Sequence, residues 1–217
     1  MDQEHQRIQE DLRGLISGEV HCDEVFLQLY SSDASIYQIR PLGVVRPRSP
    51  SDVAACLQYA SENQIPVHAR GAGTGLAGES LGRGLIIDFS HSMRRIVATD
   101  ERTVRVQPGV VHAQLNRHLS TSNRQFGPDP ALSDVTTMGS VIAVDASGSH
   151  WLRYGSARKH VESLQVVLAD GTMMEVGRHA LASAPDELGG DEPRRRELIR
   201  RLADLLSHDR DVIDQHQ

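Results

Sequence analysis

The chain has 217 residues, of which 39% are hydrophobic and 24% charged, as in a soluble protein of one large or two small domains. Its formal net charge is −6 and only 4% of its residues are aromatic. Both values argue against nucleic-acid binding, which requires a basic face and often uses aromatic rings that stack on bases. The two cysteines, Cys22 and Cys56, form neither a CxxC pair nor a Cys/His cluster. Neither a disulfide framework nor a metal site is therefore predicted.

Residues 1–35 are predicted to form an N-terminal helical segment. Ile8, Leu12, Leu15 and Ile16 recur at helical spacing, and a second turn is expected over 25–29. The first residues, MDQEHQRIQEDLRG, are polar and unlike a secretory signal, and no apolar run approaches the length of a membrane span. We expect a cytoplasmic protein, free or peripheral to a membrane.

Residues 36–92 are predicted to form a small parallel βαβ layer. Ser49 followed by Pro50 is a strong helix start, because serine caps the first turn and proline fits the first helical position. Ile65-Pro66 ends that helix. The expected order is strand 41–45, helix 50–63, strand 67–69 and strand 85–89.

Residues 93–182 are predicted to form an antiparallel sheet with flanking helices. Short apolar runs at 95–98 and 103–106 flank a turn, and Asp170-Gly171 joins two further runs in a hairpin. A helix is expected over 111–121 between them. The chain is therefore an α+β protein of two subdomains. Residues 183–217 are expected to form a C-terminal helix with four leucines inward and a solvated arginine face: Leu198, Leu202, Leu205 and Leu206.

A glycine-rich loop follows the strand at 67–69, with the sequence RGAGTGLAG over 70–78. Gly73, Gly75 and Gly78 match the dinucleotide fingerprint of Rossmann domains. Only six residues separate Gly78 from the next strand, which is too few for the crossover helix of that fold. Such a loop can instead turn several backbone N–H groups toward a phosphate, or it can be no more than a tight connection.

A second segment of small residues spans 126–148. Pro128 and Pro130 restrict its backbone, and its glycines and alanines allow a flat ring or a diphosphate to approach the main chain closely. Its hydroxyl groups could donate hydrogen bonds to phosphate. Taken alone, the segment also fits packing between helices; two such segments together favour a ligand held between two subdomains.

The two segments, in their order along the chain, resemble the FAD-binding domain of FAD-linked oxidases of the vanillyl-alcohol oxidase / p-cresol methylhydroxylase type. The glycolate oxidase and D-lactate dehydrogenase branch is the most similar. The resemblance covers residues 37–180 and includes these motifs: PVHARGAGTGLAG at 66–78, VQPGV at 106–110, GPDP at 127–130, TMGS at 137–140, YG at 154–155 and VVLADG at 166–171. It implies that the two subdomains hold extended FAD between them.

The resemblance also implies which residues contact the cofactor. The first loop would wrap the diphosphate, Pro128 and Asp129 would lie near the flavin, and Val161 would lie near the adenine. The full implied set is Arg70, Gly71, Ala72, Gly73, Thr74, Gly75, Pro128, Asp129, Thr136, Thr137, Gly139, Ser140, Ala143, Gly148, Tyr154 and Val161. Covalent members of the family carry histidine where Thr74 stands, so non-covalent FAD is expected.

Three positions depart from the family pattern: Ser140 replaces a glycine, Asp145 an asparagine and Lys159 an aspartate. A carboxylate at Asp145 would repel a phosphate unless it points away or pairs with Arg153 or Arg158. These departures give some weight to an assembly subunit that has lost FAD.

The resemblance implies hydride transfer from a 2-hydroxy acid such as D-lactate or glycolate to the flavin, with a separate electron acceptor or iron–sulfur partner. The alternatives are the FAD-free assembly subunit and an NADPH-dependent flavin reductase of the cell-wall precursor type. No catalytic residue is assigned, since structural roles are expected for the histidines at 112, 118, 150, 160 and 179. The family's substrate cap and catalytic groups would follow residue 217, so the chain by itself is expected to lack turnover.

Overall fold

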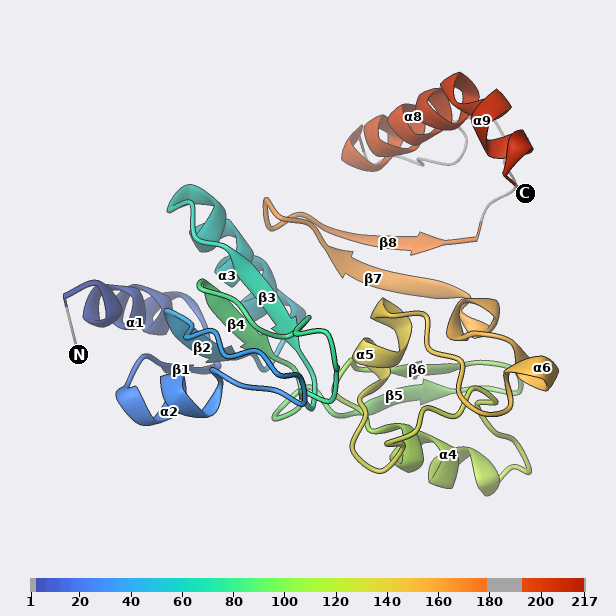
Figure 1. Cartoon of the computed structure of the whole chain (residues 1–217), viewed down its shortest axis with the longest axis horizontal. Helices are drawn as coiled ribbons and strands as arrows, with labels where there is room; N and C mark the ends of the chain where they lie inside the picture. Colours follow the sequence, from blue (N-terminus) through green and yellow to red (C-terminus); the bar gives the residue numbers. More distant parts are fainter. Residues whose placement is uncertain (1–2, 179–192, 217) are drawn as a thin grey trace. The chain divides into compact units, whose positions relative to one another are not determined.

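The structure is a computed structural model and describes residues 3–178 and 193–216. Its elements are α1 (Gln3–Leu15), β1 (Glu19–His21), α2 (Glu24–Leu29), β2 (Gly43–Arg46), α3 (Pro50–Glu62), β3 (Val67–Arg70), β4 (Leu85–Asp88), β5 (Ile96–Thr99), β6 (Val104–Val106), α4 (His112–Ser120), α5 (Met138–Ala143), α6 (Trp151–Tyr154), η1 (Ala157–His160), β7 (Ser163–Val167), β8 (Met173–Gly177), α8 (Pro193–His208) and α9 (Arg210–Gln215). Figure 1 shows them along the chain.

The chain divides into two compact units. The first contains the chain up to Val161 together with Val167–Met173, and the second contains Glu162–Val166 and the chain from Met174 onward. All of the predicted cofactor-contacting residues lie in the first unit. The domain boundaries expected at 35/36, 92/93 and 182/183 stay predictions.

A four-stranded sheet in the order β1-β2-β4-β3 forms the N-terminal part of the first unit. Strands β2 and β3 both pair in parallel with β4, which confirms the predicted βαβ layer. Strand β1 was not predicted; it pairs antiparallel with β2, with Val20 opposite Val45. At three residues it is too short to show an alternating pattern within a segment that reads as helix.

Helices α1 and α3 pack on one face of this sheet, as Figure 1 shows. Their apolar side chains share a buried cluster with the strands, in which Leu12, Cys56 and Leu85 have no exposed surface. Helix α3 begins as predicted, with the Ser49 hydroxyl accepting a hydrogen bond from the Asp52 N–H at 3.1 Å. Strand β3, and with it the start of the following loop, is therefore held by a sheet that packs closely against α1 and α3.

The second part of the first unit surrounds the antiparallel ribbon β5-β6. Helix α4 falls within the predicted range, and its Leu115 and Leu119 share a buried cluster with Met138 and Val141 of α5. The predicted hairpin is present as β7-β8; most of its two strands belongs to the second unit, and its turn, with Gly171 at a φ of +82°, belongs to the first. The antiparallel strands thus form two separate two-stranded ribbons.

The C-terminal helices expose apolar side chains. Leu202, Leu205 and Leu206 are 58%, 56% and 42% exposed, so the expectation that they point into a core is wrong. An amphipathic pattern identifies the apolar face of a helix but not what covers it.

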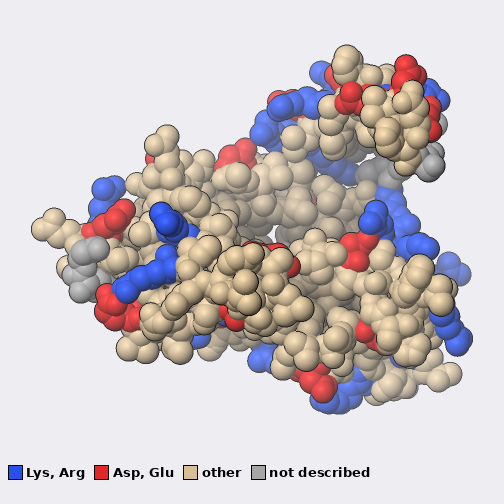
Figure 2. Space-filling view, viewed as in Figure 1, with Lys and Arg blue, Asp and Glu red and all other residues tan. Residues whose placement is uncertain are grey.

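None of the helices in the described ranges is both long and apolar enough to cross a membrane. Acidic and basic side chains are interspersed over the visible surface (Figure 2).

Candidate functional site

The glycine-rich loop connects the parallel neighbours β3 and β4 and contains no helix over residues 71–84. This confirms that it is not a Rossmann crossover. Gly73 and Gly78 have φ angles of +68° and +80°, in the left-handed region where other residues are strained. The loop thus owes its path to glycine at these two positions.

The two segments of small residues meet at Gly71. A Cβ atom on Gly71 would collide with the Thr137 and Ser140 hydroxyl oxygens, which are hydrogen-bonded to each other at 3.0 Å. Thr137 stands at the start of α5 and is 2% exposed. Only glycine at position 71 lets the loop approach the first turn of α5 this closely. The structure therefore brings together the two runs that the sequence singles out.

Helix α5 is fixed against the turn between β6 and α4. The N–H of Met138 donates to the Val110 carbonyl at 2.8 Å, and the N–H of Gly139 donates to the Pro108 carbonyl at 2.7 Å. A Cβ on Gly139 would lie 2.8 Å from the Pro108 Cβ. The small size of Gly139 thus serves contact with the protein itself, and its amide already has a partner.

Arg70 lies at the end of β3, where the loop begins. Its Nη2 donates to the Ser32 carbonyl at 2.9 Å, and its guanidinium carbon lies 5.1 Å from the centre of the Tyr30 ring. Its Nη1 is buried and has no hydrogen-bond partner among the described residues. A buried cationic donor of this kind is costly unless an acceptor reaches it, so the loop lacks an acceptor that an anion could supply.

The remaining loop positions line the same stretch with small groups. Ala72 is exposed, while Thr74 and Gly75 are half-buried. The carboxylate of Glu79 lies against Gly75 and accepts from the Ala77 N–H at 3.3 Å. Because the Glu79 side chain is exposed, it can turn into solvent and leave the loop amides to a ligand.

Asp129 joins the second segment to the loop before α6. Its N–H donates to the Ser147 carbonyl at 3.0 Å, and a Cβ on Gly148, at a φ of +86°, would collide with its backbone. Its carboxylate accepts from the His150 N–H at 3.0 Å, the Ser149 hydroxyl at 2.7 Å and His150 Nδ1 at 2.5 Å. The hydrogen bond from the His150 amide and those from the two side chains hold the pKa of Asp129 well below its usual range.

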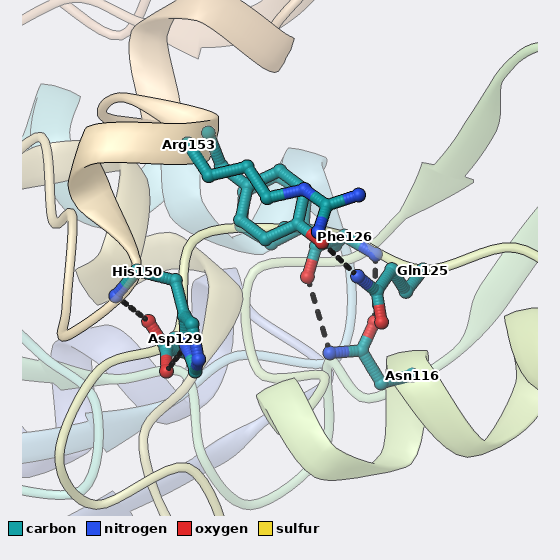
Figure 3. Close-up of a pocket in the computed structure, with 8 residues that line it drawn as sticks. Asn116, Gln125, Phe126, Asp129, His150 and Arg153 are labelled. Atoms are coloured by element: carbon teal, nitrogen blue, oxygen red, sulfur yellow. Dashed lines mark hydrogen bonds and ion pairs between the residues drawn. The ribbon is translucent and has the colours of Figure 1, made fainter.

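A pocket of about 310 Å³ opens beside this pair (Figure 3). Asn116 holds the backbone of Phe126 through two hydrogen bonds of 2.7 and 3.2 Å, and Gln125 donates to the Tyr154 hydroxyl at 2.7 Å. The Arg153 guanidinium lies 5.3 Å from the Tyr154 ring centre. The lining residues are Asn116, Gln125, Phe126, Gly127, Asp129, His150, Arg153 and Tyr154.

Tyr154 and Pro128, two of the predicted contact residues, lie at or beside this pocket. The Tyr154 ring fills the space that a side chain at Gly127 would need. The Pro128 carbonyl accepts from His112 Nε2 at 2.8 Å. The other predicted residues of this segment are spread along it: Thr136 is buried, Ala143 is exposed at the end of α5, and Val161 is half-buried after η1.

The three departures from the family pattern are accommodated locally. Asp145 has a φ of +50°, which aspartate tolerates, and its carboxylate accepts from the Arg158 N–H at 2.8 Å and pairs with the Arg158 side chain. Its charge is thereby neutralised by Arg158, one of the two arginines expected to pair with it. The Lys159 side chain lies over Gly155, and the Ser140 hydroxyl faces Gly71.

The histidines lie in structural positions or on the surface. His112 is 3% exposed, and its Nδ1 has no partner among the described residues. His118 contacts the Thr99 hydroxyl, and His160 contacts the Tyr154 carbonyl at 3.0 Å. His179 lies outside the described residues. The pairing of His150 with Asp129 was not predicted, since no sequence pattern connects two residues that only the fold brings together.

Comparison with known proteins gives consistent results. The sequence family described as FAD binding domain matches residues 41–177. The chain is 41% identical over 150 residues to a D-2-hydroxyglutarate dehydrogenase of Pantoea ananatis, covering 67% of this chain and 15% of that protein. It is 35% identical over 154 residues to glycolate oxidase subunit GlcD of Bacillus subtilis, covering 69% and 33%.

Among solved structures, an alkyldihydroxyacetonephosphate synthase superimposes with a TM-score of 0.68 at 21% identity, covering 81% of this chain and 36% of that one. This likeness supports the fold. The chain spans between 15% and 34% of the length of the curated relatives that it matches. The glycine loop, the opposing hydroxyl groups and the match over 41–177 agree with one another: the chain belongs to the FAD binding domain family, and its cofactor is FAD.

Proposed function

We propose that this chain is the cofactor-binding part of a dehydrogenase that oxidises small 2-hydroxy acids. The names of two relatives support this, because D-2-hydroxyglutarate and glycolate both carry a hydroxyl next to a carboxylate. In this reaction the acid loses a hydride from C2 and a proton from its hydroxyl and becomes a 2-oxo acid. FAD, when bound, supplies the site that takes up the hydride.

The chain's own part in the reaction is to bind and orient the cofactor. The observation that carries the proposal is the close approach of Gly71 to Thr137 and Ser140, which places loop amides and two hydroxyl groups together. Backbone N–H groups, hydroxyls and a guanidinium are the donors that a diphosphate accepts from. The Nη1 of Arg70, which no described residue hydrogen-bonds, is the cationic donor of this set.

The contact set predicted from the resemblance, Arg70 to Gly75 with the residues from Pro128 to Val161, is part of this proposal. Gly139 belongs to this set because its small size lets α5 lie close to Pro108 and so shapes the site. Its amide is not available as a donor, since it already donates to the Pro108 carbonyl. Asp129 and Tyr154 border the pocket of Figure 3, which we assign to the flavin end of the cofactor.

The electrons would leave through a separate acceptor, for which an iron–sulfur protein is a candidate. One relative is named as a subunit, which supports a partner of this kind. The Arg158 pairing of Asp145 removes the charge that favoured a subunit without FAD.

Titration of the apoprotein with FAD tests the proposal. A ligand that binds only the folded state raises its stability, by about 2.7 kcal/mol when present at about 100 times its Kd, so the Tm should rise with FAD concentration. The Gly73→Val variant should lose FAD binding, since a side chain there would meet the Arg70 guanidinium at a strained φ of +68°.

The Gly14→Ala variant is the matched control, because Gly14 lies within helix α1 and a Cβ added there would meet no atom of the other described residues within 4 Å. It should bind FAD like the natural chain and gain roughly 0.5 to 1 kcal/mol of stability. FAD binding by Gly73→Val with unchanged affinity would show that this loop is not the diphosphate site. Failure of the natural chain to bind FAD would instead favour the assembly subunit.

FAD should be bound without a covalent link. Thr74 offers only a hydroxyl at the position where covalent relatives carry a histidine. Denaturing the FAD-loaded protein in acid and removing the precipitate should therefore leave all of the flavin absorbance in the supernatant. Yellow colour remaining in the washed precipitate would contradict this expectation.

A further inference from the structure

The glycine-rich loop is supported by a segment that precedes the family match at residue 41. The Ala34 N–H donates to the Gly73 carbonyl at 3.0 Å, and Arg70 Nη2 donates to the Ser32 carbonyl at 2.9 Å. The Ser80 hydroxyl donates to Asp33 Oδ2 at 3.0 Å. Three loop positions are thus tied to residues 30–37, which we call the buttress segment.

The buttress segment also contacts the loop through two tyrosines. The Tyr30 ring lies under the Arg70 guanidinium, at 5.1 Å from its carbon, within the range of a cation–π interaction. A Cβ on Gly78 would lie 2.9 Å from the Tyr37 ring. The buttress segment therefore contacts four positions between Arg70 and Ser80.

Tyr30 is itself held rigidly. Its hydroxyl donates to Asp88 Oδ2 at 2.6 Å and accepts from Arg46 Nη2 at 3.0 Å. Asp88 is 3% exposed and ends strand β4, to which the loop returns. Tyr30 thus connects the sheet to Arg70: its hydroxyl is fixed to Asp88 of β4, and its ring contacts the Arg70 guanidinium.

A loop with six glycines over 71–84 needs such support. Glycine has more conformational freedom to lose than any other residue, so an unsupported loop of this composition is costly to order around a ligand. Contacts that fix the loop beforehand remove that cost and increase affinity.

We infer that the buttress segment, through Tyr30 and Asp33, is a positioning element that holds the loop and Arg70 ready for the FAD diphosphate. The inference rests on the proposed function, because it assigns the diphosphate to this loop. Tyr30 and Asp33 act through Arg70 and Ser80 and are positioning residues, since the described contacts join them to the loop.

The test compares four variants by their Kd for FAD and for ADP, which carries the diphosphate without the flavin. Asp33→Ala removes the acceptor of Ser80, and Tyr30→Leu removes the aromatic face under Arg70. Each should weaken the binding of both ligands by about tenfold, the worth of roughly 1.4 kcal/mol. Asp33→Asn keeps an acceptor oxygen, so it should stay within about threefold of the natural Kd. Tyr30→Phe keeps the ring but loses the hydroxyl bond to Asp88, so its Kd should lie between those of the natural chain and Tyr30→Leu.

Asp23→Ala is the matched control. Asp23 caps α2 by accepting from the Phe26 N–H at 3.2 Å, and among the contacts of the described residues none joins it to the loop. It should lower the Tm, because the helix loses its cap, and leave both Kd values unchanged. If Kd rose in every variant whose Tm fell, Asp23→Ala included, the weaker binding would reflect lost stability alone. That result would overturn the inference.

Natural Kd values for Asp33→Ala and Tyr30→Leu in folded protein would also overturn it, while leaving the proposed FAD site intact. If the natural chain bound neither FAD nor ADP, the proposed function would fail first. If Tyr30→Leu does not fold, the comparison of Asp33→Ala with Asp33→Asn still tests the inference. Asp33 is only half-buried, so both of these variants are expected to fold.

Discussion

Single carboxylates in this chain are held by several donors at once. Asp52, in the first turn of α3, is 6% exposed and accepts from the Arg48 N–H at 2.8 Å and from the Ser17 N–H and hydroxyl at 3.1 Å. Burial alone would raise its pKa, but the hydrogen bonds from Arg48, Ser17 and Ser49 outweigh burial and lower it. The same principle applies to Asp145, whose pKa is lowered by the hydrogen bonds from the Arg158 amide and side chain.

Asp52 therefore predicts a pH dependence of stability. A lowered pKa in the folded state contributes stability above the unfolded value of 3.8, and this contribution is lost as pH falls through the folded pKa. Asp52→Asn should lower the free energy of unfolding by about 1 to 3 kcal/mol at pH 7. The difference in Tm from the natural chain should shrink as the pH falls below 4. Asp134→Asn, at an exposed position, is the control and should change the free energy of unfolding at pH 7 by no more than about 0.5 kcal/mol.

At the level of elements, β4 carries the sheet that supports the loop. All four of its residues are buried, and it pairs in parallel on both sides, with β2 and β3. A continuous apolar run is typical of a strand buried on both faces, which is why the sequence predicts this strand well. The short elements β1 and α5 escaped prediction because they hold too few residues for a period to appear.

Ile86→Ala should destabilise the domain strongly. Ile86 has no exposed surface, and removing its buried methyl and methylene groups leaves a cavity that costs about 2 to 5 kcal/mol. Denaturant unfolding monitored by circular dichroism measures the loss. Val97→Ala on β5 is the control, since Val97 is 58% exposed and should change stability by only about 0.5 kcal/mol. Equal losses in both variants would show that β4 does not support the core.

At the level of the whole molecule, the proposed cofactor residues lie in one compact unit. Arg70, Thr137, Asp129 and the other members of the set fall before Val161 or at it. Helices α8 and α9 belong to the second unit. Because every residue of the proposed contact set belongs to the first unit, we expect FAD binding not to require these helices.

A protein ending after Arg178 should bind FAD with a Kd within roughly twofold of the natural value, the range typical of changes at surface positions. Fluorescence titration of both proteins with FAD measures the ratio. A loss of about tenfold or more, equal to about 1.4 kcal/mol, would show that the C-terminal helices contribute to the site.

By itself, the sequence determined the features that depend on neighbours in the chain: the capped start of α3 at Ser49, the Asp-Gly turn before β8, and a glycine loop too short for a crossover helix. These follow from local dihedral preferences and spacing. The tertiary structure alone decided which distant groups meet, as Gly71 with Thr137, Asp129 with His150, and Tyr30 with Arg70. Such contacts depend on how sheet and helices pack in space, and no local pattern encodes them.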